Sequence, residues 1–280
     1  MGRDGITGDM FGNMSFDSSS DDECAADKHE ADGTAVDEEG HERAGDSDAG
    51  VPAVVNPARD EVGYEPHIGP PILVRQICER GLSFQLWPAA SGMCGYLENG
   101  YGGGGGESLR DARVLELGAG TGMAGMMAAR FGARVTLTDL PHVLENLQCN
   151  VELNLKEVEA CGGSVAVQPL RWGVEEDAKN FVSPPPDLIL ASDCVYYDTL
   201  FEPLMQTLKW LCGIGEGEKE TPGIGSPVVL VAHLRRWKKD GQFFRMAAKC
   251  FNVEVVHRHP LVNSRVGVVV YKLTRKISSQ

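Results

Sequence analysis

The stretch Glu116 to Gly125 (ELGAGTGMAG) combines an acidic residue with four glycines, and its residue types suggest a ligand-binding loop. It follows a short apolar run, as expected where a buried strand ends in a turn. Glycines let a backbone approach a ligand closely, and many such loops hold phosphate. Glu116 does not suit a phosphate, because two like charges at 4 Å repel by roughly 4 kcal/mol at an effective dielectric constant near 20.

Two ligand classes fit the glycine spacing. The pattern GxGxxG from Gly120 matches a dinucleotide loop, and Asp139 follows nineteen residues later, about where a ribose-binding acid belongs. From Glu116 the same stretch has the pattern ExGxGxG of S-adenosylmethionine enzymes. That cofactor carries an ammonium and a sulfonium, so Glu116 attracts it, and we predict S-adenosylmethionine as the cofactor. The structural alternatives are a salt-bridged strand-end acid for Glu116 and a helix N-cap for Asp139.

A second candidate site follows a later apolar run in residues 184–198 (PPPDLILASDCVYYD), where Asp193 and Tyr196 form an Asp-x-x-Tyr pattern. A lysine amine, with a pKa of about 10.4, must lose its proton before it attacks a methyl group. A carboxylate can orient the arriving ammonium and an aromatic face can desolvate it. We therefore predict Asp193 and Tyr196 as the residues that position the acceptor, although a plain strand-end turn with half-buried tyrosines also explains them.

The folded part of the chain alternates short apolar runs with amphipathic stretches, which is typical of an α/β domain with a parallel sheet covered on both faces. The last two strands are joined by too short a link for a helical crossover, so they should form an antiparallel hairpin. We predict a class I, Rossmann-like methyltransferase fold with seven mostly parallel strands, one of them antiparallel. The expected strands are 114–117, 134–138, 165–170, 188–191, 228–232, 253–256 and 266–271, and the expected helices are 123–130, 143–155, 200–211 and 242–250.

Charge is distributed unevenly along the chain. Residues 1–60 contain sixteen acidic and four basic residues, so they carry −12 of the formal net charge of −14. We predict that this segment is a disordered acidic tail, either a solvated extension or an interaction tail, and that residues 61–280 form the catalytic domain. The low basic content argues against nucleic acid as a partner. No segment is apolar enough for a membrane span or a secretory signal. The eight cysteines lack a C-x-x-C pair, so no metal site is expected and a cytosolic or nuclear setting is favoured.

Five stretches occur in this order: GLSFQLWPAASGMCGYLE (81–98), VLELGAGTGMAGMMAARFGARVTLTDLPHVLENLQCNVELN (114–154), PLRWG (169–173), DLILASDCVYY (187–197) and HLRRWKKDGQFF (233–244). Together they resemble methyltransferase family 16, the seven-β-strand protein-lysine methyltransferases. The resemblance covers about residues 64–275, and its most specific part is the Asp-x-x-Tyr combined with the upstream Trp-Pro-Ala-Ala.

The resemblance implies an S-adenosylmethionine-dependent transfer to a lysine of a protein substrate, either free or within a complex. We expect the enzyme itself to be a monomer. The chain departs from many relatives by having His233-Leu234-Arg235 where they place an aromatic residue before the arginine, and this departure falls in the acceptor pocket. The implied cofactor contacts are Trp87 at the methionine part, Gly118, Ala119 and Gly120 in the loop, Asp139 at the ribose, Trp172 at the adenine, and Ser192 just before Asp193.

Other functions remain open at this stage. A small-molecule N-methyltransferase would have the same fold. An NAD(P)-dependent oxidoreductase is disfavoured by Glu116 and by the lack of a Ser/Tyr-x-x-x-Lys arrangement, and a silent binding module is disfavoured because both halves of a site are present.

Overall fold

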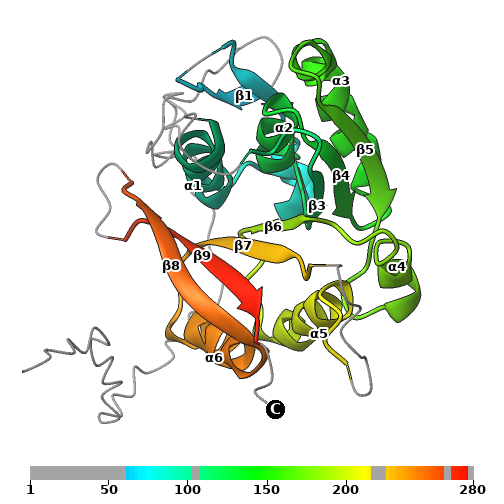
Figure 1. Ribbon diagram of the computed structural model, residues 1–280. Helices are drawn as coiled ribbons and strands as arrows, with labels where there is room; N and C mark the ends of the chain where they lie inside the picture. Colours follow the sequence, from blue (N-terminus) through cyan, green and yellow to red (C-terminus); the bar gives the residue numbers. More distant parts are fainter. Residues whose placement is uncertain (1–60, 68, 103–107, 216–224, 262–265, 277–280) are drawn as a thin grey trace, which may run out of the picture. The chain divides into compact units, whose positions relative to one another are not determined.

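The computed structural model describes residues 61–67, 69–102, 108–215, 225–261 and 266–276. The proposed acidic tail, residues 1–60, lies outside them, so its boundary stays a prediction. The described part contains a two-stranded and a seven-stranded sheet with helices (Figure 1). The helices are α1 (Pro88–Leu97), α2 (Met123–Arg130), α3 (Leu144–Ala160), α4 (Glu175–Lys179), α5 (Phe201–Leu211) and α6 (Gly241–Cys250).

The seven-stranded sheet has the order β5-β4-β3-β6-β7-β9-β8 and confirms the predicted fold class. All neighbouring pairs from β5 to β7 are parallel, and β9 is antiparallel to both β7 and β8. The reversed strand is therefore inserted next to the edge and is not the edge itself. The strands are β3 (Arg113–Leu117), β4 (Arg134–Asp139), β5 (Ser164–Pro169), β6 (Leu188–Ser192), β7 (Val228–Leu234), β8 (Phe251–His259) and β9 (Val268–Arg275).

Alternate residues of the central strands point into two separate cores. Val114 of β3 packs in the core that contains α1, α2 and α3, whereas its neighbour Leu115 packs in the core that contains α5 and α6. Leu190 and Ile189 of β6 divide in the same way. Because both faces of these strands are buried, the strands have almost no polar positions, which explains their continuous apolar sequence.

An N-terminal unit that the sequence did not reveal precedes the main sheet. Strands β1 (Glu61–Tyr64) and β2 (Ile72–Arg75) form an antiparallel pair. Two buried amides of α3, Asn150 and Asn154, hold β2 by accepting hydrogen bonds from the backbone N–H groups of Arg75 and Leu73. Two short 3-10 turns then lead into α1, which begins with Pro88 directly after Trp87. This unit carries Trp87 to the functional site. No helix of the described residues has the length and apolar character needed to cross a bilayer.

Candidate active site

The carboxyl ends of the parallel strands open into a cavity of about 360 Å³. It lies where the strand order reverses between β3 and β6, which is where open α/β sheets bind ligands. We call the residues at and after β3, β4 and β5 the cofactor side, and those at and after β6 and β7 the acceptor side. Nine of the ten site residues expected from sequence line this cavity: Trp87, Gly118, Ala119, Gly120, Asp139, Trp172, Ser192, Asp193 and Tyr196.

The glycine loop follows β3 and turns back through left-handed backbone conformations. Gly118 has a φ of 58° and Gly120 a φ of 55°, a region that residues with a Cβ rarely adopt. A Cβ on Gly118 would lie 2.7 Å from the ring of Trp172, so the bare backbone lets this ring approach the loop. The loop is anchored where the N–H of Ala119 donates to the carbonyl of Thr138 in β4, at 2.9 Å. At Gly118 and Gly120 the loop thus presents bare backbone to the cavity.

Glu116 differs from its expected position, because it is 1% exposed and lies beneath the cavity lining. Its Oε2 accepts a hydrogen bond from the N–H of Gly125 in the first turn of α2, at 2.8 Å, and its Oε1 accepts one from the hydroxyl of Ser192, at 3.1 Å. Burial raises the pKa of Glu116 to about 8. The carboxyl group therefore connects the loop to α2 and, through its hydrogen bond with Ser192, to β6. It does not face the cavity.

Asp139 ends β4 and faces the cavity with only 6% exposure. Its Oδ2 accepts a hydrogen bond from the N–H of Gly120, at 2.8 Å, and its Oδ1 accepts one from the N–H of Leu140, at 2.7 Å. Burial raises the pKa of Asp139, against these two hydrogen bonds. The residue before α3 is Val143, so Asp139 is not the N-cap of that helix. It braces the glycine loop and keeps lone pairs for a ligand.

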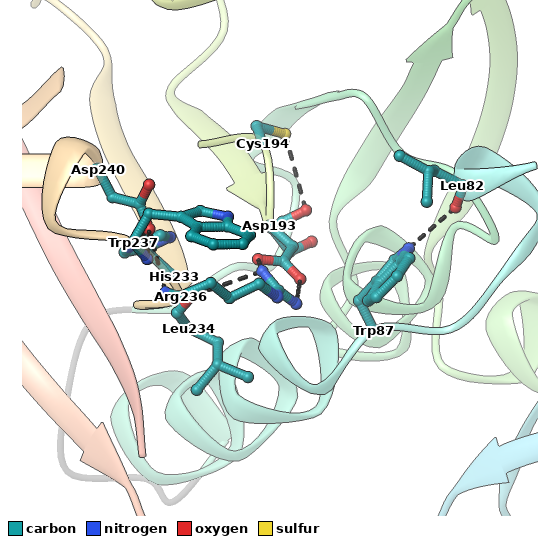
Figure 2. A network of polar contacts seen from close by, with 10 residues as sticks. Leu82, Trp87, Asp193, Cys194, His233, Leu234, Arg236, Trp237 and Asp240 are labelled. Atoms are coloured by element: carbon teal, nitrogen blue, oxygen red, sulfur yellow. Dashed lines mark hydrogen bonds and ion pairs between the residues drawn. The ribbon is translucent and has the colours of Figure 1, made fainter. Parts of the chain in front are cut away.

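The acceptor side contains a contact that the sequence reasoning missed, between Asp193 after β6 and Arg236 after β7. The guanidinium donates two hydrogen bonds to the carboxylate, with Nη1–Oδ1 at 2.7 Å and Nη2–Oδ2 at 2.6 Å. The side chain of Asp193 is 5% exposed and that of Arg236 is 28% exposed. This bidentate pair raises the pKa of Arg236 above its ordinary value. Figure 2 shows the guanidinium of Arg236 directly beside the carboxylate of Asp193, joined to it by dashed lines.

Arg236 also reaches the N-terminal unit. Its guanidinium carbon lies 5.2 Å from the centroid of the Trp87 ring, within the range of a cation–π contact. The indole Nε1 of Trp87 donates to the carbonyl of Leu82 at 2.9 Å, which fixes the ring (Figure 2). Arg236 therefore links three segments that are far apart in sequence. The only sequence signal for it was two arginines directly after a strand of a parallel sheet.

A buried carboxylate positions the backbone of Arg236. Asp240 is 1% exposed, and its Oδ2 accepts hydrogen bonds from the N–H groups of Arg236, at 3.1 Å, and Trp237, at 3.0 Å. The same oxygen lies 3.4 Å from Nε2 of His233, and burial lowers the pKa of this histidine. The carboxylate of Asp240 thus fixes the backbone of the turn between β7 and α6.

Aromatic side chains form the rim on the acceptor side. Tyr196 is half-buried, and its ring lies 4.8 Å from that of Tyr197, measured between centroids. Burial raises the pKa of Tyr196 to about 12, so its hydroxyl stays protonated near neutral pH. Tyr197 and Trp237 are 53% and 58% exposed, yet both line the cavity. Exposed aromatic surface at a cavity mouth is typical of a site that receives a partner.

These features fit S-adenosylmethionine. The volume of the cavity falls in the range of small-molecule sites, and the lack of side chains at Gly118 and Gly120 lets Trp172 and the backbone of Ser83 pack closely against the loop that lines it. Asp139 offers an acceptor for hydroxyl groups, and the rings of Trp87 and Trp172 offer flat apolar walls. The charge of Glu116 acts on the cofactor less directly than expected, because Glu116 is buried beneath the loop and does not reach the cavity.

Comparisons with known proteins agree with this geometry. The lysine methyltransferase family matches residues 69–250 of the chain. The protein is 36% identical over 196 residues to protein N-lysine methyltransferase METTL21A of Mus musculus, which covers 70% of this chain and 79% of the relative. It is 34% identical to the METTL21A of Danio rerio, over 71% of this chain and 80% of the relative. It is 33% identical to EEF1A lysine methyltransferase 3 of Mus musculus, over 66% and 71%. With its class I fold and a cavity for S-adenosylmethionine, the chain belongs to the lysine methyltransferase family.

Proposed function

We propose that this S-adenosylmethionine-dependent enzyme methylates a lysine of a protein substrate by placing the amine between Asp193 and Tyr196. The observation that carries the proposal is the position of Asp193. Its carboxylate is almost fully buried in the protein, yet it lines the same cavity as the glycine loop. An acidic side chain at the end of β6, opposite the cofactor side, is suited to receive a basic acceptor.

The cofactor side would hold the methyl donor through backbone and aromatic surface. Asp139 would bind the ribose hydroxyls with the lone pairs that Gly120 and Leu140 leave open. Trp172 would pack on the adenine, and Trp87 would pack near the methionine part. Glu116 and Ser192 would contribute by fixing the loop, since their mutual hydrogen bond joins β3 to β6.

The acceptor side would supply orientation and desolvation. When bound, the cofactor supplies an electrophilic methyl group, so the protein has no difficult bond to activate. Asp193 would accept a hydrogen bond from the amine, and the ring of Tyr196 would exclude water from one side of it. Tyr196 keeps its proton near neutral pH and so does not serve as the base. Proton loss to solvent before transfer is consistent with the exposure of Tyr197 and Trp237, which line the cavity.

We also propose that the enzyme acts in the cytosol or nucleus. The seven cysteines among the described residues are all unpaired, which is usual in a reducing compartment. Fractionation of cells that express the tagged full-length chain would test the location directly.

Labelled S-adenosylmethionine tests the function. The full-length protein is incubated with the cofactor and a protein extract whose own methyltransferases have been heat-inactivated, and labelled proteins are analysed by mass spectrometry. We expect label on lysine Nε of one or a few proteins. Label only in the small-molecule fraction would instead assign a small-molecule N-methyltransferase, and label on another residue type would exclude the proposed acceptor.

A further inference from the structure

The Asp193–Arg236 pair raises a question about the acceptor, because a cation already occupies the carboxylate that should receive it. A bidentate guanidinium uses two of the roughly four lone-pair positions of a carboxylate. The remaining positions of Asp193 can still accept a hydrogen bond from an amine. The pair as a whole is neutral, so it attracts an ammonium far less than a lone carboxylate would.

We propose that Arg236 makes the acceptor site select the neutral, reactive form of the lysine amine. The guanidinium cancels the charge of Asp193 and repels an ammonium at close range, while Asp193 keeps its hydrogen-bonding capacity. Arg236 is thus a positioning residue that acts through Asp193. This inference rests on the proposed role of Asp193 in binding the amine.

The surroundings of the pair support a fixed guanidinium. Both carboxylate oxygens are engaged at 2.6 and 2.7 Å, the Trp87 ring lies 5.2 Å from the guanidinium carbon, and Asp240 holds the backbone N–H of Arg236 (Figure 2). A bidentate fork held at its backbone, its head group and one face is expected to stay in place when an acceptor arrives.

The other charged groups of the cavity do not take over this role. Among the described residues that line it, the cations are Arg171 and Arg236, and Arg171 is paired with Asp177 at 2.8 Å on the cofactor side. The titratable groups that face the amine position are Asp193, Cys194, Tyr196 and Tyr197 after β6, Arg236 after β7, Asp139 of β4 and Arg171 after β5, with Glu116, His233 and Asp240 behind them.

The direct test measures binding of n-butylamine, a mimic of the lysine side chain, to the full-length protein loaded with S-adenosylhomocysteine. Three cavity-lining tryptophans, Trp87, Trp172 and Trp237, allow binding to be followed by fluorescence. If the neutral amine is selected, apparent affinity rises about tenfold per pH unit between about pH 7 and pH 9, because the neutral fraction of an alkylamine does so below its pKa. Affinity that is flat with pH in the parent protein would overturn the proposal without any variant.

Substitutions then assign the effect to Arg236. Arg236→Gln leaves Asp193 as an unpaired carboxylate, so we expect it to bind the ammonium more tightly than the parent at about pH 7, with a nearly flat pH dependence. Arg236→Lys keeps the charge and should keep the pH dependence of the parent. The matched control is Lys238→Gln, which removes an exposed neighbouring charge that does not line the cavity and should behave as the parent does.

Methyl transfer separates this inference from the proposed function. In single-turnover transfer to the extract proteins, the midpoint of the pH–rate profile of Arg236→Gln should rise by about one unit or more, the usual effect of a charge within 4–6 Å. The rates of variant and parent should converge at high pH. An unchanged midpoint, or a faster variant at every pH, would overturn the inference. No lysine transfer by the parent at any pH would instead contradict the proposed function, whatever the amine-binding result.

Discussion

The cofactor side and the acceptor side of the cavity are built in different ways. On the cofactor side, short hydrogen bonds join backbone to buried carboxyl groups, as where Asp139 accepts from Gly120 and Glu116 accepts from Gly125. On the acceptor side, long side chains meet from separate segments, and Tyr197 and Trp237 are more than half exposed. The difference suggests that one side holds a constant ligand rigidly, whereas the other receives a variable partner.

Replacement of Asp193 should separate the two sides most clearly. Asp193→Asn keeps the size of the side chain but removes the charge that binds Arg236 and helps to orient the amine. We expect single-turnover transfer to fall by about 100-fold or more, about 2.7 kcal/mol in the barrier, with little change in the affinity for S-adenosylmethionine measured by calorimetry. Asp198→Asn, at an exposed aspartate paired with Lys239, is the control. Transfer at the parent rate would place Asp193 in a purely structural turn.

Replacement of Asp139, in contrast to that of Asp193, should act on cofactor binding. Asp139→Ala removes both the brace on the glycine loop and the acceptor for the ribose, so affinity for S-adenosylhomocysteine should fall by about 1.5 to 3 kcal/mol. Calorimetry at a fixed pH measures this, with Glu152→Ala on the exposed face of α3 as the control. Unchanged affinity for S-adenosylhomocysteine would show that Asp139 only braces the glycine loop and does not contact the cofactor.

The buried Glu116 predicts a pH effect on stability that belongs to the cofactor side. Its pKa is raised to about 8, so the folded state holds a proton that the unfolded state releases near pH 4.5. The stability that this group contributes is therefore fully present below the pKa of the unfolded state and is lost as pH rises towards 8. Glu116→Gln has no such proton, so denaturant unfolding should show it gaining about 2 kcal/mol on the parent between about pH 6 and pH 8.5. Parallel pH curves for the two proteins would show that Glu116 does not titrate in this range.

Tyr196 should give the smallest effect. If the ring face, and not the hydroxyl, surrounds the amine, Tyr196→Phe should change transfer by less than about threefold. Tyr196→Ala should cost about 1 to 2 kcal/mol, or roughly 5- to 30-fold. Rates for both variants, measured with saturating cofactor, decide between ring and hydroxyl. Equal losses in the two variants would assign the role to the hydroxyl.

The same contrast explains what the sequence could predict. The glycine loop is one continuous stretch, so its pattern already indicates the cofactor class, and alternation of apolar runs was enough for the sheet. The orientation of Glu116 was not predicted, because the pattern does not tell which way a side chain at the end of a strand points. The carboxyl group of Glu116 points towards α2. A Cβ on Gly125 would clash with the side chain of Leu137 and would lie 2.7 Å from Oε2 of Glu116, so the last glycine of the pattern makes room for buried side chains, not for a ligand.

The acceptor side was only half predictable for the opposite reason. Asp193 and Tyr196 stand close together in sequence, but their partners Trp87 and Arg236 come from distant segments that only the folded chain brings together. The hairpin of β1 and β2 was missed because it is short and pairs outside the main sheet. The antiparallel pairing of β8 and β9 follows from their short connection, but the insertion of β9 beside β7 depends on packing that no local pattern records.

That insertion has a consequence for how the enzyme is made. Strand β8 leaves the ribosome before β9, yet it cannot join the sheet until β9 has filled the place beside β7. Leu234, two residues before Arg236, pairs with Val268 of β9, so the turn that carries Arg236 gains this neighbour only after β9 has been synthesised. We therefore expect methyl transfer to require Val268–Arg275, the strand that completes the sheet beside β7.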